Sequence, residues 1–327
     1  MRKKFLIPIF FLIMNFSVRG QDYWTSPDRL TWLTATNWSS GVPTSTDVAQ
    51  FRANPTANSA YISVTTNTYQ DVGAIELTPA RSNDISIGNG GSSNSSGKLR
   101  IFGATVNNVQ NVILRNNSSR LLTLKDYQGT GSSLLTVTLN DGTTDVINID
   151  GSGGITISSS IAGSNINLTR SGTGSGILTL TNSYYTFTGT TTLSQGEMRF
   201  NPISVNATFK SQIVLNGGRL STTSIIVNTV LTDSSTLELN ASSTIALGNI
   251  AHALKFSDSH NITWNGMLLT ITGWTGVAGV SGTYGKIYIG TDANGLSANQ
   301  LTKISFAGFP VGAKIRHIIQ GEAFRPS

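Results

Sequence analysis

The sequence predicts an all-β protein, a single-stranded right-handed parallel β-helix (solenoid) with N- and C-terminal caps. Short runs of alternating apolar and polar residues recur about every ten to twelve residues and are bounded by Gly, Asn, Ser or Asp. Charged residues are only 12% of the chain, against about 25% in an average soluble protein. Asn-Gly and Asp-Gly steps between two good strands are few, although the hairpins of a sandwich would need them. These observations favour stacked rungs over a sandwich.

The first 20 residues are predicted to be an export signal. Basic residues at positions 2–4 precede the apolar run Phe5–Phe16, and the small residues Val18 and Gly20 fit a cleavage site before Gln21. The apolar run is shorter than the roughly 20 residues that a membrane-spanning helix needs, and no later run approaches that length. We therefore expect no transmembrane segment after cleavage, and a protein that is secreted or held at the cell surface or outer membrane.

Charge and cysteine content exclude several classes of function. Residues 1–20 carry four basic side chains and no acidic one, so the formal charge falls from +6 to +2 on cleavage. This small excess gives little support for a nucleic-acid partner. The chain has no Cys, which excludes a lipoprotein anchor, a disulfide framework and thiolate chemistry.

The order of the segments predicts an N-terminal cap at 21–60, a β-helix at 61–272 and a closing segment at 273–327. Trp24, Trp32 and Trp38 are expected to cover the first rung, because an open sheet end invites aggregation, and Trp264 and Trp274 to do the same at the other end. Strands are predicted at Lys98–Phe102, Val109–Leu114, Leu121–Lys125, Leu134–Leu139, Asp145–Ile149, Ile155–Ser159, Ile166–Thr169, Ile177–Leu180, Thr191–Leu193, Glu197–Phe200, Gln212–Leu215, Ile225–Val227, Thr236–Leu239 and Thr244–Leu247.

One stretch, residues 168–201, carries a recognisable pattern. It consists of a glycine-rich start with alternating apolar residues at 171–180, an aromatic-Thr-Gly-Thr segment at 185–192, and a final Gly-x-Met at 196–198. This stretch resembles the autotransporter-associated β-strand repeat of secreted bacterial proteins, with departures at Thr190, at Met198 and around Ser175. The resemblance implies a passenger-type β-helix, and the repeat describes a scaffold that supplies no catalytic residues.

The resemblance extends more loosely to both ends. Trp32 and residues 37–43 and 47–51 are similar to the opening segment of such proteins, and residues 269–274, 287–290, 295–301, 304–306 and 321–322 to the closing segment. In many relatives the closing segment precedes a membrane β-barrel or a sorting tail. Neither follows before Ser327, and the sequence leaves open whether the protein is released or a sorting region is missing.

An acidic stretch between residues 141 and 150 is the metal candidate. Stacked turns of a β-helix could bring Asp141, Asp145 and Asp150 together as oxygen ligands for calcium. The stretch lacks the nine-residue glycine-aspartate repeat of calcium-loaded rolls. The alternative is that Asp and Gly shape exposed corners. No other cofactor is expected.

No catalytic residues are predicted. The chain has three histidines, His252, His260 and His317, and no Gly-x-Ser-x-Gly. Glu197 and Arg199 should share one strand face, and Tyr184, Tyr185 and Phe187 could stack on sugars or pack a turn.

The expected function is structural or adhesive, with extracellular glycans or surface proteins as partners. The alternative is a polysaccharide lyase or glycoside hydrolase, which would need carboxylates converging in a groove.

Overall fold

The structure is a computed structural model, and its first strand begins at Gln21. It describes residues 20–26, 30–53, 59–61, 69–89, 97–125, 127–129, 131–133, 135–223, 229–232, 235–265, 268–277, 282–309, 313–318 and 321–326. For strands at 59–61, 127–129, 131–133, 229–232, 313–318 and 321–326, the description is of the backbone. The predicted export signal, residues 1–20, lies outside these ranges except for Gly20.

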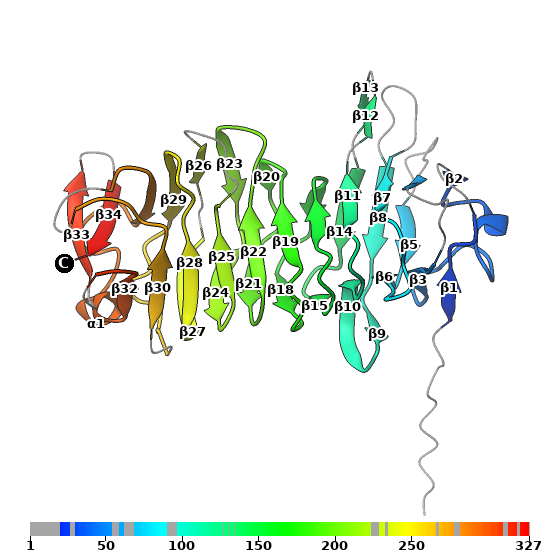
Figure 1. The fold of residues 1–327 in the computed structure, drawn as a ribbon, viewed down its shortest axis with the longest axis horizontal. Coiled ribbons are helices and arrows are strands. Elements are labelled where there is room, and N and C mark those ends of the chain that lie inside the picture. Colours follow the sequence, from blue (N-terminus) through cyan, green and yellow to red (C-terminus); the bar gives the residue numbers. More distant parts are fainter. Residues whose placement is uncertain are drawn as a thin grey trace, which may run out of the picture.

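The described chain winds through three long faces whose strands stack along the long axis of the molecule (Figure 1). The first sheet contains β1 (Gln21–Tyr23), β3 (Val48–Phe51), β6 (Ala74–Leu77), β10 (Val109–Asn116), β15 (Thr144–Ile149), β18 (Ile166–Ser171), β21 (Gly189–Leu193), β24 (Gln212–Asn216) and β27 (Leu237–Ala241), with β9 (Ala104–Val106) attached to β10. The second sheet contains β2 (Leu30–Thr31), β4 (Ser59–Tyr61), β7 (Ile85–Gly88), β11 (Leu122–Lys125), β16 (Ile155–Ile157), β19 (Ile177–Leu180), β22 (Glu197–Phe200), β25 (Arg219–Ser221), β28 (Ser243–Ala246), β30 (Leu269–Thr272) and β32 (Ile304–Phe306).

The third face is divided into a 4-stranded and a 7-stranded sheet. The first of these holds β5 (Tyr69–Val72), β8 (Gly97–Ile101), β14 (Leu135–Leu139) and β17 (Ser160–Ala162). The second holds β20 (Tyr184–Tyr185), β23 (Asn206–Phe209), β26 (Thr229–Thr232), β29 (His252–Phe256), β31 (Gly285–Ile289) and the terminal antiparallel pair β33 (Ala313–Ile318) and β34 (Gly321–Pro326). The remaining elements are the hairpin β12 (Tyr127–Gly129) and β13 (Gly131–Ser133), the 3₁₀ turn η1 (Ala35–Asn37) and the helix α1 (Ala298–Thr302).

One rung of the coil is about 23 residues long. Thr144 pairs in register with Asn167, and Asn167 with Thr190. Inside the coil, each sheet stacks apolar side chains directly on one another. In the second sheet this row runs without a break from Ile155 through Leu178, Met198, Leu220, Ile245 and Ile271 to Phe306, and every member is at most 1% exposed. Burial of these rows is the main source of stability in such a fold.

These parallel ladders confirm the predicted parallel β-helix. Two strands, Ile177–Leu180 and Glu197–Phe200, have the bounds that alternation alone predicted. The others that the structure describes differ by one or two residues at their ends, as expected because strand ends are the least certain part of an assignment. The predicted strand Ile225–Val227 lies outside the described residues.

The corner between the first and second sheets is built from glycine. A Cβ atom placed on Gly174 would lie 2.2 Å from the carbonyl oxygen of Gly151 in the preceding rung, and one on Gly176 would lie 2.1 Å from that of Gly153. No side chain fits at such a distance, so the glycine-rich start of the 168–201 pattern is required by the close approach of successive corners.

Both ends of the solenoid are capped by tryptophans. Trp24, Trp32 and Trp38 are at most 4% exposed and pack edge to face beside Phe51. At the other end, Trp264 donates from Nε1 to the carbonyl of Leu237 at 3.0 Å. Leu237 belongs to β27, the last strand in the order of the first sheet. Trp264 therefore supplies a hydrogen bond to a backbone carbonyl on the edge strand of that sheet.

Parallel pairing extends beyond the predicted β-helix boundaries of 61 and 272. Within 21–60 it already joins β1 to β3, and it continues into 273–327, where β32 pairs with β30 and β31 pairs with β29. In the described part of the chain no helix is long and apolar enough to cross a bilayer.

A hairpin on the outside of the first sheet has no counterpart in the sequence analysis. β9 and β10 pair antiparallel around Asn107 and Asn108, whose φ angles are 46° and 64°. Two positive φ values define the type I′ hairpin turn, which Asn adopts less easily than Gly. The hairpin encloses a small outer cluster with Val106 and Val112 at its centre.

Candidate functional site

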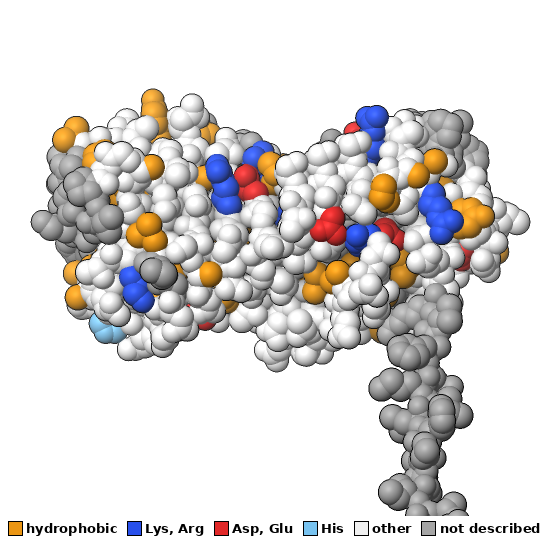
Figure 2. All heavy atoms as spheres, turned by 60° about the horizontal axis from the view of Figure 1, so that its bottom comes forward, with side chains coloured by type: hydrophobic (Ala, Val, Ile, Leu, Met, Phe, Trp, Pro, Cys, Tyr) orange, Lys and Arg blue, Asp and Glu red, His pale blue; other side chains and the backbone are white. Residues whose placement is uncertain are grey.

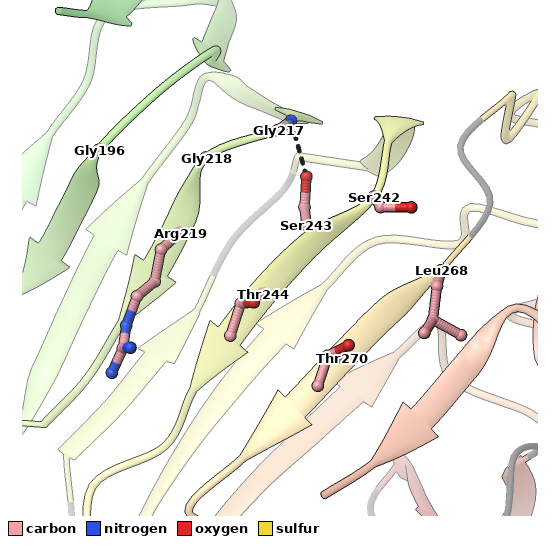
Figure 3. Close-up of a pocket in the computed structure, with 9 residues that line it drawn as sticks. All are labelled: Gly196, Gly217, Gly218, Arg219, Ser242, Ser243, Thr244, Leu268 and Thr270. Atoms are coloured by element: carbon pink, nitrogen blue, oxygen red, sulfur yellow. Dashed lines mark hydrogen bonds between the residues drawn. The ribbon is translucent and has the colours of Figure 1, made fainter. Parts of the chain in front are cut away.

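A groove on the outer face of the second sheet is the candidate site. It has a volume of about 270 Å³ and is lined by Gly196, Gly217, Gly218, Arg219, Ser242, Ser243, Thr244, Leu268 and Thr270. These residues come from the starts of β25, β28 and β30 and from the corners before β22, β25, β28 and β30 (Figure 3). The three glycines contribute no side chain, so the backbone itself forms that side of the groove.

One row of side chains crosses the groove from rung to rung. Arg219 pairs in register with Thr244, and Thr244 with Thr270, so their side chains follow one another on neighbouring strands (Figure 3). Adjacent parallel strands are about 4.8 Å apart. The row therefore presents one guanidinium and two hydroxyls at regular short intervals.

Most hydroxyls of the groove are available to a ligand. Within the described ranges, the side chains of Ser242, Thr244 and Thr270 have no hydrogen-bond partner in the protein. Ser243 differs, because its Oγ accepts from the backbone N–H of Gly217 at 2.9 Å and donates to the carbonyl of Ala241 at 2.9 Å. Ser243 therefore fixes the corner, and its three neighbours can exchange water for a ligand.

The groove ends at a small charged group on β22. Arg199 donates from Nη2 to Glu197 Oε1 at 2.8 Å, and Arg219 Nε lies 3.3 Å from Glu197 Oε2. This confirms that Glu197 and Arg199 share one strand face. The group carries two positive charges and one negative charge, and the Arg219 side chain is 45% exposed.

On the face drawn in Figure 2, charged side chains are sparse, and they occur as small mixed groups or as single basic groups. Most of this surface is uncharged. Exposed ion pairs of this kind add little stability, with a typical contribution of about 0–1 kcal/mol, so the net positive charge of the Glu197 group is free to act on a ligand.

The groove contains no group suited to acid–base catalysis. None of its nine lining residues is Asp, Glu, His or Lys. Hydrolysis of a glycosidic bond normally requires a pair of carboxyl groups on either side of it. Glu197, which contacts the lining residue Arg219, has both oxygens engaged by arginines.

The three calcium candidates lie at different parts of one rung. Asp141 accepts from the backbone N–H of Ser164 at 2.6 Å in the corner before β15. Asp150 follows β15 and pairs with Arg115 at 3.1 Å. Asp145 is 1% exposed and shares its strand face with the inward-facing Ile147 and Ile149.

The distance between these carboxylates determines whether they could bind one metal ion together. Five residues of extended strand, from Asp145 to Asp150, cover about 16 Å, whereas calcium ligands lie within about 2.6 Å of the ion. Among the described residues no group of three or more His, Cys, Asp or Glu side chains could hold a metal ion. Burial raises the pKa of Asp145 to about 6.

The histidines occupy unrelated places. His252 is buried, with Nε2 2.7 Å from Thr222 Oγ1 and Nδ1 2.7 Å from the carbonyl of Ile250, and its burial lowers the pKa of the ring below 6.5. His260 is exposed near the C-terminal cap. His317 lies on β33, where the description is of the backbone.

The aromatic candidates divide into core and surface. Tyr185 and Phe187 are each 1% exposed and pack edge to face on Phe209. Tyr184 is 60% exposed. The packing alternative therefore holds for two of the three, and Tyr184 is left as a surface ring at the corner after β19.

Sequence analysis did not single out Arg219, Thr244 and Thr270. They follow one another at intervals of 25 and 26 residues, which are close to one rung. A search for outward polar residues at the rung spacing could have found them, but the exact register comes only from the strand pairing.

No family model, no curated protein and no solved structure matches this chain.

Proposed function

We propose that this protein is a non-catalytic, structural and adhesive β-helix that is exported and binds glycans through its outer face. The observation that carries the proposal is the groove at Arg219, Thr244 and Thr270, which offers hydrogen-bond donors and acceptors with no catalytic pair beside them. Sugar hydroxyls are recognised by such convergent polar groups. A weakly charged surface around the groove suits neutral or mildly charged glycans.

Export and family are part of the same proposal. The basic and apolar segments of residues 1–20 support a signal that directs the chain to the cell surface or the medium. The 168–201 pattern supports an autotransporter passenger, because its glycines occupy corners where a Cβ atom would collide with the preceding rung. In that setting the solenoid displays its groove away from the cell, and glycans or surface proteins are its partners.

The test is a glycan array combined with a reducing-sugar release assay on the protein purified after export. We expect retention on a subset of glycans with no release of reducing ends. Release that depends on the protein would overturn the proposal in favour of a polysaccharide-cleaving enzyme, and no retention on any glycan would reject glycan binding. N-terminal sequencing of the exported protein should begin at Gln21, and an intact Met1 would contradict export through this signal.

A further inference from the structure

We infer that the groove binds an acidic sugar, with the carboxylate of a uronic acid residue on Arg219 and the sugar hydroxyls on Thr244 and Thr270. This inference rests on the proposed function, because it names the class of glycan for the same groove. Three observations carry it: the charge balance, the free hydroxyls and the size of the site.

The charge balance comes from the Glu197 group. Glu197 carries one negative charge beside two arginines. Arg199 makes more hydrogen bonds to it than Arg219 does, because Arg199 Nε and Nη2 both donate to Glu197 Oε1, at 3.0 and 2.8 Å. Arg219 uses only Nε toward Glu197, at 3.3 Å. Among the described residues its two Nη groups have no hydrogen-bond partner, and a carboxylate is the external acceptor that the planar guanidinium fork fits best.

The hydroxyls explain why the ligand should be a sugar acid. Thr244 and Thr270 stand beside Arg219 in one row, and Ser242 lies at the corner above them (Figure 3). Hydroxyls both donate and accept, which matches the ring and exocyclic hydroxyls of a sugar. A polyphosphate such as a nucleic acid would instead need several cations in series, and the lining contains one.

The volume sets the length of ligand that is held. Ligand pockets for drug-sized molecules have volumes of about 300–1,000 Å³, and this groove has about 270 Å³. It therefore suits one sugar unit of a longer chain that continues over the surface. Binding of one sugar unit at this site should be weak. The overall affinity for a polysaccharide would be higher if several of its units bound at the same time.

The experiment measures binding of polygalacturonate, its fully methyl-esterified form and dextran sulfate to the full exported chain by calorimetry or retention on immobilised polymer. We expect binding of polygalacturonate, loss on esterification, and weakening with added salt. The variant Arg219→Gln should weaken binding about tenfold or more, because a hydrogen bond between charged groups is lost. Lys210→Gln removes the same charge from an exposed position outside the groove and should leave binding unchanged.

Two further variants separate a role in binding from a general charge effect. Glu197→Gln keeps the shape but removes the competing carboxylate, so binding of polygalacturonate should become tighter. Thr270→Val removes one hydroxyl with little change in size and should weaken binding several-fold. All variants should keep the circular dichroism spectrum and melting temperature of the parent, since these side chains lie at the surface.

The outcomes distinguish this inference from the proposed function. Equal binding of the acid and the methyl ester, or full binding by Arg219→Gln, would overturn the acidic-sugar inference and leave glycan binding standing. Preference for dextran sulfate over polygalacturonate would overturn the assignment of a carboxylate. Binding of no polysaccharide, neutral or acidic, would overturn both.

Discussion

The carboxyl group of Asp145 lies 2.7 Å from the hydroxyl of Thr143, and the same hydroxyl lies 2.6 Å from the carbonyl of Asn140. A hydroxyl has one hydrogen to donate. Thr143 can therefore donate to the carboxyl group of Asp145 or to the carbonyl of Asn140, but not to both at once. Burial raises the pKa of Asp145 to about 6, and the hydrogen bond from Thr143 opposes this rise.

Replacing Asp145 with Asn should stabilise the protein at neutral pH. Below pH 3.8 the carboxyl is neutral in the folded and unfolded states; between pH 3.8 and about 6 the unfolded chain ionises first, so stability falls as pH rises. A pKa shift from 3.8 to about 6 corresponds to about 3 kcal/mol. Urea unfolding should show Asp145→Asn more stable by up to that amount at pH 7 and equal to the parent near pH 4. The same difference at both pH values would contradict the assignment.

His252 should produce the opposite pH dependence. The Ile250 carbonyl only accepts, so Nδ1 donates to it and the neutral ring uses Nε2 to accept from Thr222. Because the pKa of His252 is lowered from 6.5 by burial, the unfolded chain takes up a proton first as pH falls below 6.5, and stability decreases. Between pH 7.5 and pH 5.5 the melting temperature of the parent should fall relative to that of His252→Gln, because the opposite contribution of Asp145 is the same in both proteins. The exposed His260 provides the control, since His260→Gln should leave the slope of the parent.

Alternation predicted the solenoid well because the period of a strand is local. The same alternation also predicts two inward-facing polar residues that the sequence analysis did not recognise. Asp145 alternates in step with Ile147 and Ile149. Arg170 alternates in step with Leu168, so both polar side chains lie on the inner face of their strands. Arg170 is 1% exposed and donates from Nη2 to the carbonyl of Gly176 at 2.9 Å, while burial lowers its pKa to about 10. A polar residue at an inward position of an alternating strand is usually assigned to the outer face, and only the packing seen in the structure shows that it is buried.

The groove was less accessible to sequence analysis. Its residues are separated by a full rung, and whether Arg219 pairs with Thr244 or with another residue of β28 depends on corner lengths that vary between rungs. The β9–β10 hairpin was missed for a related reason, because Asn107 and Asn108 were not treated as a type I′ turn. The groove depends on pairing between rungs and the hairpin on a local turn, and neither is visible in the alternation within a single strand.

The stacked corners predict a severe effect at Gly174. The variant Gly174→Ala would place a methyl group 2.2 Å from the carbonyl oxygen of Gly151, so two rungs must separate or the corner must rebuild. Overpacking of this kind costs about 1–3 kcal/mol or more. Chemical unfolding should show that loss. Ser175→Ala, one position along and exposed, should change stability by less than about 0.5 kcal/mol; equal losses in both variants would show that the corner tolerates a side chain.

The N-terminal tryptophans predict that aggregation starts where the solenoid is uncapped. Trp32 is 0% exposed, packs at 4.6 Å from the ring of Trp38 and accepts a hydrogen bond from Trp38 Nε1 at its carbonyl. Trp32→Ala should cost about 3–5 kcal/mol and open the first rung, and deletion of Gln21–Phe51 should go further by exposing the edge of β6. Size-exclusion chromatography and light scattering should then show oligomers or precipitate. The neighbouring Leu33 is 48% exposed, so Leu33→Ala is the matched control and should stay monodisperse. A soluble, monomeric deletion variant with the melting temperature of the parent would show that the tryptophan cluster is not a cap, because an unprotected strand edge would otherwise recruit a second chain.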